Sequence, residues 1–151
     1  MSQIYAKGVA ALLAGVMLNF LGDRLLGVRV EAFAGISTFT FLWMLDVFLV
    51  PFAVGLVVAK IFGKGSKWLA CIPPMLVRSL SYLYFYYSDP QGDFFFKLHL
   101  HYWGLCVILA VEAANIGGIL GEVLMGVYRD KEDDTNQKNL PLKKKSDFQQ
   151  I

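Results

Sequence analysis

Charged residues are scarce over most of this 151-residue sequence. Its 14 Lys and Arg and 12 Asp and Glu residues are unevenly placed, because 11 of these charged residues follow Tyr128. Hydrophobic residues make up 56% of the chain, and the mean hydropathy is +0.52. Soluble domains of this length are less apolar. The composition therefore excludes an ordinary soluble fold and indicates an integral membrane protein.

Cysteine and histidine are rare as well, with two residues of each type. Cys71 and Cys106 have neither the number nor the spacing of a disulfide framework or a zinc site. We interpret both as small packing residues, which is how buried free cysteines usually behave. His99 and His101 are weak metal candidates, because no further ligand set accompanies them to complete a closed site. We therefore predict no metal site and no cofactor.

Sequence motifs of known enzyme chemistry are also lacking. The chain contains no glycine-rich phosphate loop, no CxxC, no HExxH and no nucleophile elbow, so we predict no catalytic residues. Nucleic-acid binding would require a basic face, but the Lys and Arg residues gather at the ends of apolar segments instead. The expected partners are the lipid bilayer and other membrane protein subunits or a second copy of the chain.

Long apolar runs are what the sequence has in abundance. Four of them, at about residues 4–21, 36–59, 68–87 and 103–128, are close to the length that crosses a bilayer as a helix. We predict an all-α bundle of four transmembrane helices, followed by a polar tail over residues 129–151 that cannot fold alone. Residues 22–35, between the first two spans, are expected to lie outside the hydrocarbon region.

Lys and Arg residues are divided unequally between the two sides of this four-span arrangement. Ten lie on the side of the N-terminus, the second connection and the tail, and three lie on the other side. Positively charged residues favour the cytoplasmic side of a membrane. We therefore predict a multi-pass protein of a bacterial inner membrane, with both termini in the cytoplasm.

Three charged residues lie near the middle of predicted spans, namely Asp46, Arg78 and Glu112. Charges at that depth are costly, and mutual pairing is a usual way to accommodate them. Because a guanidinium can donate to two carboxylates, we predict a buried cluster in which Arg78 pairs with both acids. Its excess negative charge favours protonation of one carboxyl or recruitment of a cation. Such a cluster either holds the helices together or relays a proton or cation.

The fourth span combines small residues with polar ones. Small residues let a second helix approach closely. We predict a helix-packing or partner-docking face made of Ala110, Ala113, Ala114, Gly117, Gly118 and Gly121. Asn115 and Glu122 share a stripe with Glu112 as secondary polar candidates, because steps of three and four residues return to one helix face. Glu122 is expected to lie at the headgroup region, in a surface role.

Two further residues bear on helix packing. Asn19 continues a row with Ala11 and Gly15 at four-residue spacing, so we expect its side chain to hydrogen-bond to a neighbouring helix. Pro51 has no backbone N–H, so it is expected to free the carbonyl group of Val47 and to kink the second helix.

Two main functions remain open on sequence grounds. The first is a non-catalytic subunit that assembles into and stabilises a larger membrane protein complex through its buried charges and the small-residue face. The alternative is a small oligomeric transporter or channel that moves a proton or cation through Asp46, Arg78 and Glu112. A membrane-embedded enzyme or metal carrier that uses His99 and His101 is a third hypothesis.

Overall fold

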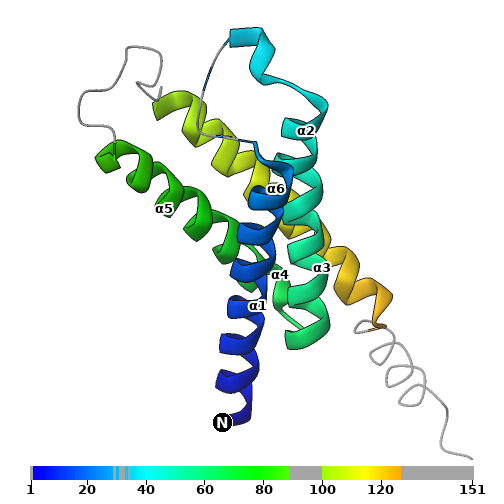
Figure 1. Ribbon diagram of the computed structural model, residues 1–151. Coiled ribbons are helices and arrows are strands. Elements are labelled where there is room, and N and C mark those ends of the chain that lie inside the picture. The colour runs from blue at the N-terminus through cyan, green and yellow to red at the C-terminus, as the bar shows by residue number, and fades with distance from the viewer. Residues whose placement is uncertain (1, 29, 31–32, 34, 89–99, 127–151) are drawn as a thin grey trace, which may run out of the picture.

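The described part of the fold consists of helices and the turns between them. A computed structural model describes residues 2–28, 30, 33, 35–88 and 100–126, in which no strand occurs. The elements in chain order are α1 (Ser2–Leu26), η1 (Gly35–Thr38), α2 (Phe41–Met44), η2 (Leu45–Leu49), α3 (Val50–Phe62), α4 (Ser66–Ala70), α5 (Ile72–Ser88) and α6 (Leu100–Leu124) (Figure 1). The η1 element is a 3-10 helix, and η2 is a turn of π-helix. The predicted tail at 129–151 lies outside the described residues.

Three helical segments are long and apolar enough to cross a membrane: Gln3–Leu26, Phe41–Phe62 and His101–Leu124. The second of these joins α2, η2 and α3 into one span. The prediction of an all-α membrane protein is confirmed at this level, whereas the third predicted span contains the shorter, 17-residue α5. Helix α1 continues past the predicted end of the first span at residue 21, and the second span begins later than the predicted residue 36.

Helix α3 is the central element, because it packs against both α1 and α6. In Figure 1, α1 runs in the opposite direction to α2 and α3, and α5 diverges from α1 and α3 toward its C-terminal end. The start of α1 and the end of α6 lie toward the same end of the molecule. Large apolar side chains such as Leu13, Leu49 and Ile116 are exposed on the outside of the spanning helices, as a lipid-facing surface requires.

Glycines produce the closest contact between α3 and α6. A Cβ atom added to Gly55 would overlap the carbonyl oxygen of Ala114, and one added to Gly117 would overlap the carbonyl oxygen of Phe52. Only residues without a side chain allow two helix backbones to approach this closely. The α3–α6 interface therefore depends on glycine at these two positions.

The predicted small-residue face of α6 is covered by helices of the same chain. Its members Ala110, Ala113, Ala114, Gly117, Gly118 and Gly121 are all buried. Part of the face meets α3 and part meets α4, where a Cβ on Gly118 would lie 3.1 Å from the Cα of Lys67. The expectation of helix packing thus describes this face correctly, but the alternative expectation of partner docking has to be corrected, because the face is already occupied.

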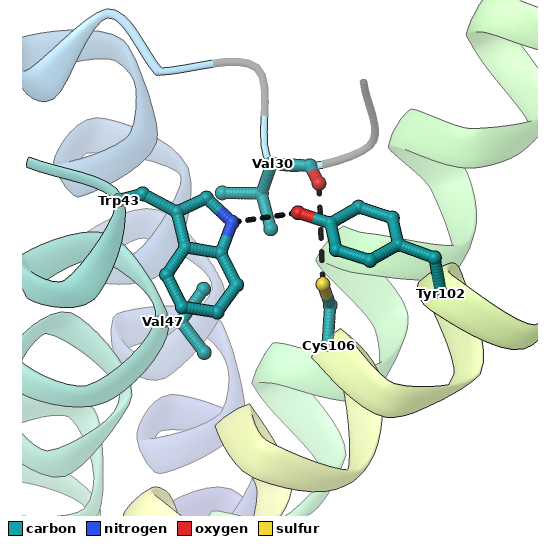
Figure 2. Close-up of a cluster of buried hydrophobic side chains, with 5 residues drawn as sticks. All are labelled: Val30, Trp43, Val47, Tyr102 and Cys106. Carbon is teal, nitrogen blue, oxygen red and sulfur yellow. Dashed lines mark hydrogen bonds between the residues drawn. The ribbon is translucent and has the colours of Figure 1, made fainter. Parts of the chain in front are cut away.

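A buried cluster joins the segment after α1 to the second span and to α6. Figure 2 shows the side chains of Trp43 and Tyr102 directed toward each other, and Trp43 Nε1 donates a hydrogen bond to the Tyr102 hydroxyl at 2.8 Å. The thiol of Cys106 lies 4.0 Å from the carbonyl oxygen of Val30 (Figure 2). Val47 completes the buried group. These contacts hold the start of α6 against the second span.

Candidate functional site

Arg78 is the centre of a buried ion-pair cluster. Its side chain, on α5, is 2% exposed. Nη2 donates to Oδ1 of Asp23 on α1 at 2.9 Å and to Oδ2 of Asp46 on η2 at 3.2 Å. The same nitrogen lies 3.3 Å from the backbone carbonyl oxygen of Asp46. One guanidinium nitrogen therefore connects three helices that are distant in the sequence.

The carbonyl group of Asp46 is available to Arg78 because of the local backbone register. In η2, the N–H of Val50 donates to the carbonyl group of Leu45, five residues earlier. Residue 51 would donate to the carbonyl group of Asp46 in this π-helical register, but Pro51 has no N–H. The carbonyl that the proline leaves free is thus one residue earlier than an α-helical register predicts. Arg78 provides the missing donor.

The second acid of the cluster is Asp23, so the predicted grouping with Glu112 has to be corrected. Helix α1 does not end before the charged segment but continues to Leu26 and carries Asp23 into the bundle. The four-residue row of Gly15 and Asn19 reaches Asp23 at its next step. This four-residue spacing is the sequence signal that places Asp23 on the same face of α1 as the buried Asn19.

The ion-pair cluster lies toward one end of the spanning helices instead of at their midpoints. Asp46 is within two turns of the start of the second span, and Asp23 is in the last turn of α1. The Asp23 side chain is 17% exposed, whereas that of Asp46 is 0% exposed. Charges cost most at the centre of a bilayer. Two acids are therefore accommodated more easily here than at the predicted midplane position.

Unsatisfied polar atoms near this cluster include those of Asn19 and one carboxylate oxygen of Asp46. Asn19 lies one turn before Asp23 on α1 and is fully buried. Among the described residues, neither its Nδ2 nor its Oδ1 has a hydrogen-bond partner, and Oδ1 of Asp46 has none either. The predicted interhelical hydrogen bond of Asn19 is thus not formed within the described chain. Buried polar atoms without hydrogen bonds are uncommon in protein interiors, so this part of the bundle is unusual.

Glu112 lies apart from the ion-pair cluster, on the outside of the bundle. It is at the midpoint of α6 and is exposed. At 100° per residue it is turned well away from the buried Ala114 and Gly117 on the same helix. No residue that the structure describes forms a hydrogen bond or an ion pair with its carboxylate. Among the described residues, the Glu112 carboxylate therefore has no hydrogen-bonding or ion-pairing partner, and it is exposed on the outside of a spanning helix.

An apolar groove of about 500 Å³ adjoins Glu112. One wall is formed by the second span and the other by α6. The main lining residues are Phe41, Leu45, Phe48 and Phe52 on the second span and Leu109 and Ile116 on α6. Glu112 is the one charged residue among those that line the groove. The groove wall is almost entirely apolar, so Glu112 contributes its aliphatic stem to the wall and its carboxylate lies at the edge of the groove.

Glu122 has a buried structural role in place of the predicted surface role. It lies in the last turn of α6 and is 1% exposed. Its Oε1 accepts hydrogen bonds from the Ser66 hydroxyl at 2.9 Å and from the N–H of Lys67 at 3.3 Å. These two residues begin α4, whose N-cap residue is a glycine without a capping side chain. The first N–H groups of a helix lack partners within the helix, so Glu122 caps α4 from α6.

Replacing Glu122 with leucine is expected to lower the free energy of unfolding by about 1–3 kcal/mol, because the buried Ser66 hydroxyl and the partly buried N–H of Lys67 lose their acceptor. Glu122→Gln is the matched control, since its amide oxygen can still accept both hydrogen bonds and should preserve most of the stability. The unfolding midpoint in detergent, followed by circular dichroism, measures both variants. Equal losses for the two substitutions would contradict the capping role.

The remaining predicted polar candidates lie on α6 or just before it. Asn115 is half-buried, and His101 is exposed in the first turn of the helix. His99 lies outside the described residues. Within the part of the chain that the structure describes, no group of three or more His, Cys, Asp or Glu side chains is placed to hold a metal ion. The metal-carrier hypothesis therefore gains no support from these residues.

Comparisons with known proteins provide no relative from which a function can be transferred. No protein-family model, no curated protein and no solved structure matches this chain. The Arg78 cluster and the Glu112 groove are therefore the features from which a function is inferred.

Proposed function

We propose that this protein is a small, non-catalytic subunit that assembles into and stabilises a larger membrane protein complex. The observation that carries the proposal is the exposed carboxylate of Glu112 at the midpoint of α6, beside an apolar groove. A carboxylate at this position is costly unless a cation, a polar group or another protein chain meets it. Lipid chains provide no such group, whereas a second membrane protein does.

The ion-pair cluster supports this role as part of a rigid platform. Arg78 connects α1, η2 and α5 through its contacts with Asp23 and Asp46. Removing one member of such a pair would leave a buried charge, so the arrangement favours one relative placement of the three helices. In the proposed role, this cluster holds the helices that present the groove.

The proposed membrane topology has four crossings, with both termini and the polar tail in the cytoplasm. Helices α4 and α5 together provide the third crossing, with a break at Cys71 between them. Lys60, Lys64 and Lys67 lie in or beside the connection before it, and ten Lys and Arg residues are assigned to the side of that connection, the N-terminus and the tail. The excess over the three on the opposite side favours a cytoplasmic location.

A small oligomeric transporter or channel for a proton or cation is the second candidate function. The observation that favours it is the set of buried atoms without partners among the described residues, which includes Oδ1 of Asp46 and both side-chain polar atoms of Asn19. Intramembrane carboxylates and amides of this kind occur along ion and proton pathways. In this alternative, Asp46 and not Glu112 is the group that binds the transported ion.

Purification from the native membrane in mild detergent tests the proposed function. The expected result is an assembly clearly larger than the 16.9 kDa chain, with at least one different membrane protein in a fixed ratio. A protein that purifies alone from its native membrane would contradict the subunit role.

The transport alternative is tested with the purified chain alone in liposomes. A proton or cation flux that Asp46→Asn abolishes, while the variant remains folded, would favour transport over the subunit role. The matched control is Asn115→Ala, which alters a half-buried polar residue on α6 and should leave any flux through the Asp46 region unchanged.

A further inference from the structure

We propose that the groove beside Glu112 is the docking site for one transmembrane helix of a different protein chain, which presents a lysine or arginine to the Glu112 carboxylate. This inference deepens the proposed role as a complex subunit and rests on it. It identifies both the surface that the partner covers and the chemistry by which the partner is recognised.

The shape of the groove fits a helix. Phe41, Leu45, Phe48 and Phe52 line one wall, and their spacings of four, three and four residues place them on one stripe of the second span. The stripe extends over about 16 Å, or three helical turns, at the rise of an α-helix. The opposite wall is α6, which packs alongside α3. An apolar groove between two helices is a recurrent site for the apolar face of a third helix.

The single charged lining residue determines what kind of helix the groove accepts. A lipid acyl chain would cover the apolar walls but would leave the Glu112 carboxylate without a partner inside the bilayer. A helix that carries a lysine or arginine at the same depth satisfies both the apolar walls and the carboxylate. Pairing between charges on different helices is a usual fate of ionisable residues in membranes. Charge complementarity therefore favours a cationic helix as the occupant.

A second copy of this chain does not provide that cation. Glu112 is at the midpoint of the 25-residue α6, about 18 Å from either end of the helix. Among the described residues, Arg78 is the one basic residue well inside a helix, and its guanidinium already contacts Asp23 and Asp46. The other described Lys and Arg residues lie within two turns of a helix end, far from the depth of Glu112. The matching cation therefore comes from a different chain.

The π-helical turn connects the groove to the ion-pair cluster. Within η2, the buried Asp46 faces Arg78, whereas Leu45, Phe48 and Leu49 line the groove. Turns of π-helix inside longer helices frequently occur at functional sites. The contacts that Arg78 makes with the side chain and the carbonyl group of Asp46 thus also hold this wall of the docking site in place.

Photo-cross-linking of the full-length protein in its native membrane tests the proposal. A photoreactive amino acid at position 48, in the groove, is expected to form an adduct with a transmembrane segment of a different chain that contains a lysine or arginine. The matched control is position 13, because Leu13 is 62% exposed near the middle of α1 and does not line the groove. The same adduct is not expected from position 13.

Charge substitutions test whether the carboxylate recognises the partner. Glu112→Gln is expected to lower the yield of the position-48 adduct roughly tenfold or more, because a buried cation loses its counter-charge. Glu122→Gln makes the same chemical change later in α6, at the cap of α4, and should leave the yield unchanged. Glu112→Lys should abolish the adduct, and replacing the basic residue of the cross-linked segment with glutamate should restore it.

Three results would overturn the docking proposal. They are an adduct between two copies of this chain, an adduct whose yield does not respond to Glu112→Gln, and exclusive labelling of lipid from position 48. If an assembly with another membrane protein is still recovered in mild detergent, these results refute the docking site and leave the subunit role standing. If no assembly is recovered, the subunit role fails together with the docking site.

Discussion

Replacing Arg78 with methionine is expected to lower the free energy of unfolding by about 3–5 kcal/mol, the usual effect of removing one partner from a buried ion pair. Methionine fills much of the same space but leaves the 0%-exposed Asp46 carboxylate without its counter-charge. It also removes the donor to the carbonyl group of Asp46. The unfolding midpoint in detergent and the loss of the monodisperse folded fraction measure the effect.

Two further variants identify the cause of that loss. Adding Asp46→Asn to Arg78→Met should recover part of the stability, because a neutral amide no longer buries an uncompensated charge. Arg24→Met removes an exposed arginine at the end of α1 and should change the free energy of unfolding by no more than about 0.5 kcal/mol. A double variant less stable than Arg78→Met alone would contradict the ion pair as the source of the effect.

Substituting Gly117 with alanine is expected to lower the free energy of unfolding by about 1–3 kcal/mol, as overpacking of a tight contact does. The added Cβ atom would overlap the carbonyl oxygen of Phe52, so α3 and α6 have to move apart along their interface. Because the obstructing atom belongs to the backbone, a change of side-chain rotamer cannot relieve the overlap. The midpoint of unfolding in detergent measures the loss.

Gly104→Ala is the matched control for this substitution on the same helix. A Cβ atom at Gly104 has no atom within 4 Å, so the change should be neutral or should stabilise the helix by up to about 1 kcal/mol. Effects of opposite sign in Gly117→Ala and Gly104→Ala distinguish close packing from helix propensity. Equal effects would refute the close α3–α6 contact. The small-residue face of α6 lies inside the protein. If a glycine variant no longer bound a partner subunit, the cause would therefore be loss of the fold. Substitutions of Glu112 test partner docking directly.

The candidate site could be predicted from the sequence only in part. The pairing of Arg78 with Asp46 follows from two opposite charges inside apolar segments, and the structure confirms it. The four-residue spacing of Gly15 and Asn19 continues to Asp23, so this residue could have been predicted to face the same neighbouring helices. A first span that ends at residue 21 leaves Asp23 out of the bundle. The boundary was wrong because apolar content shows where a hydrophobic segment stops, whereas backbone hydrogen bonds determine where the helix ends.

The different positions of Glu112 and Glu122 could not be predicted from helix periodicity. Both residues belong to the predicted polar stripe of α6, yet Glu122 is buried against α4 and Glu112 is exposed in the groove. Periodicity assigns side chains to a face of one helix and carries no information about which neighbour covers that face at each level. The short α4 covers Glu122 at the end of α6, and nothing in the described chain covers the side of its middle that carries Glu112.

The sequence by itself determined that this is an all-helical membrane protein, because apolar runs as long as the bilayer is thick must satisfy their backbone groups within helices. It also determined that Arg78 needs acidic partners, because an unpaired charge among apolar segments is too costly to retain. The tertiary structure alone decided that Asp23 is the second partner, that the glycines of α6 meet α3, and that Glu112 remains outside. The physical reason is that the order and rotation of packed helices depend on how well their whole surfaces fit together. The sequence of one helix does not specify which other helices pack beside it.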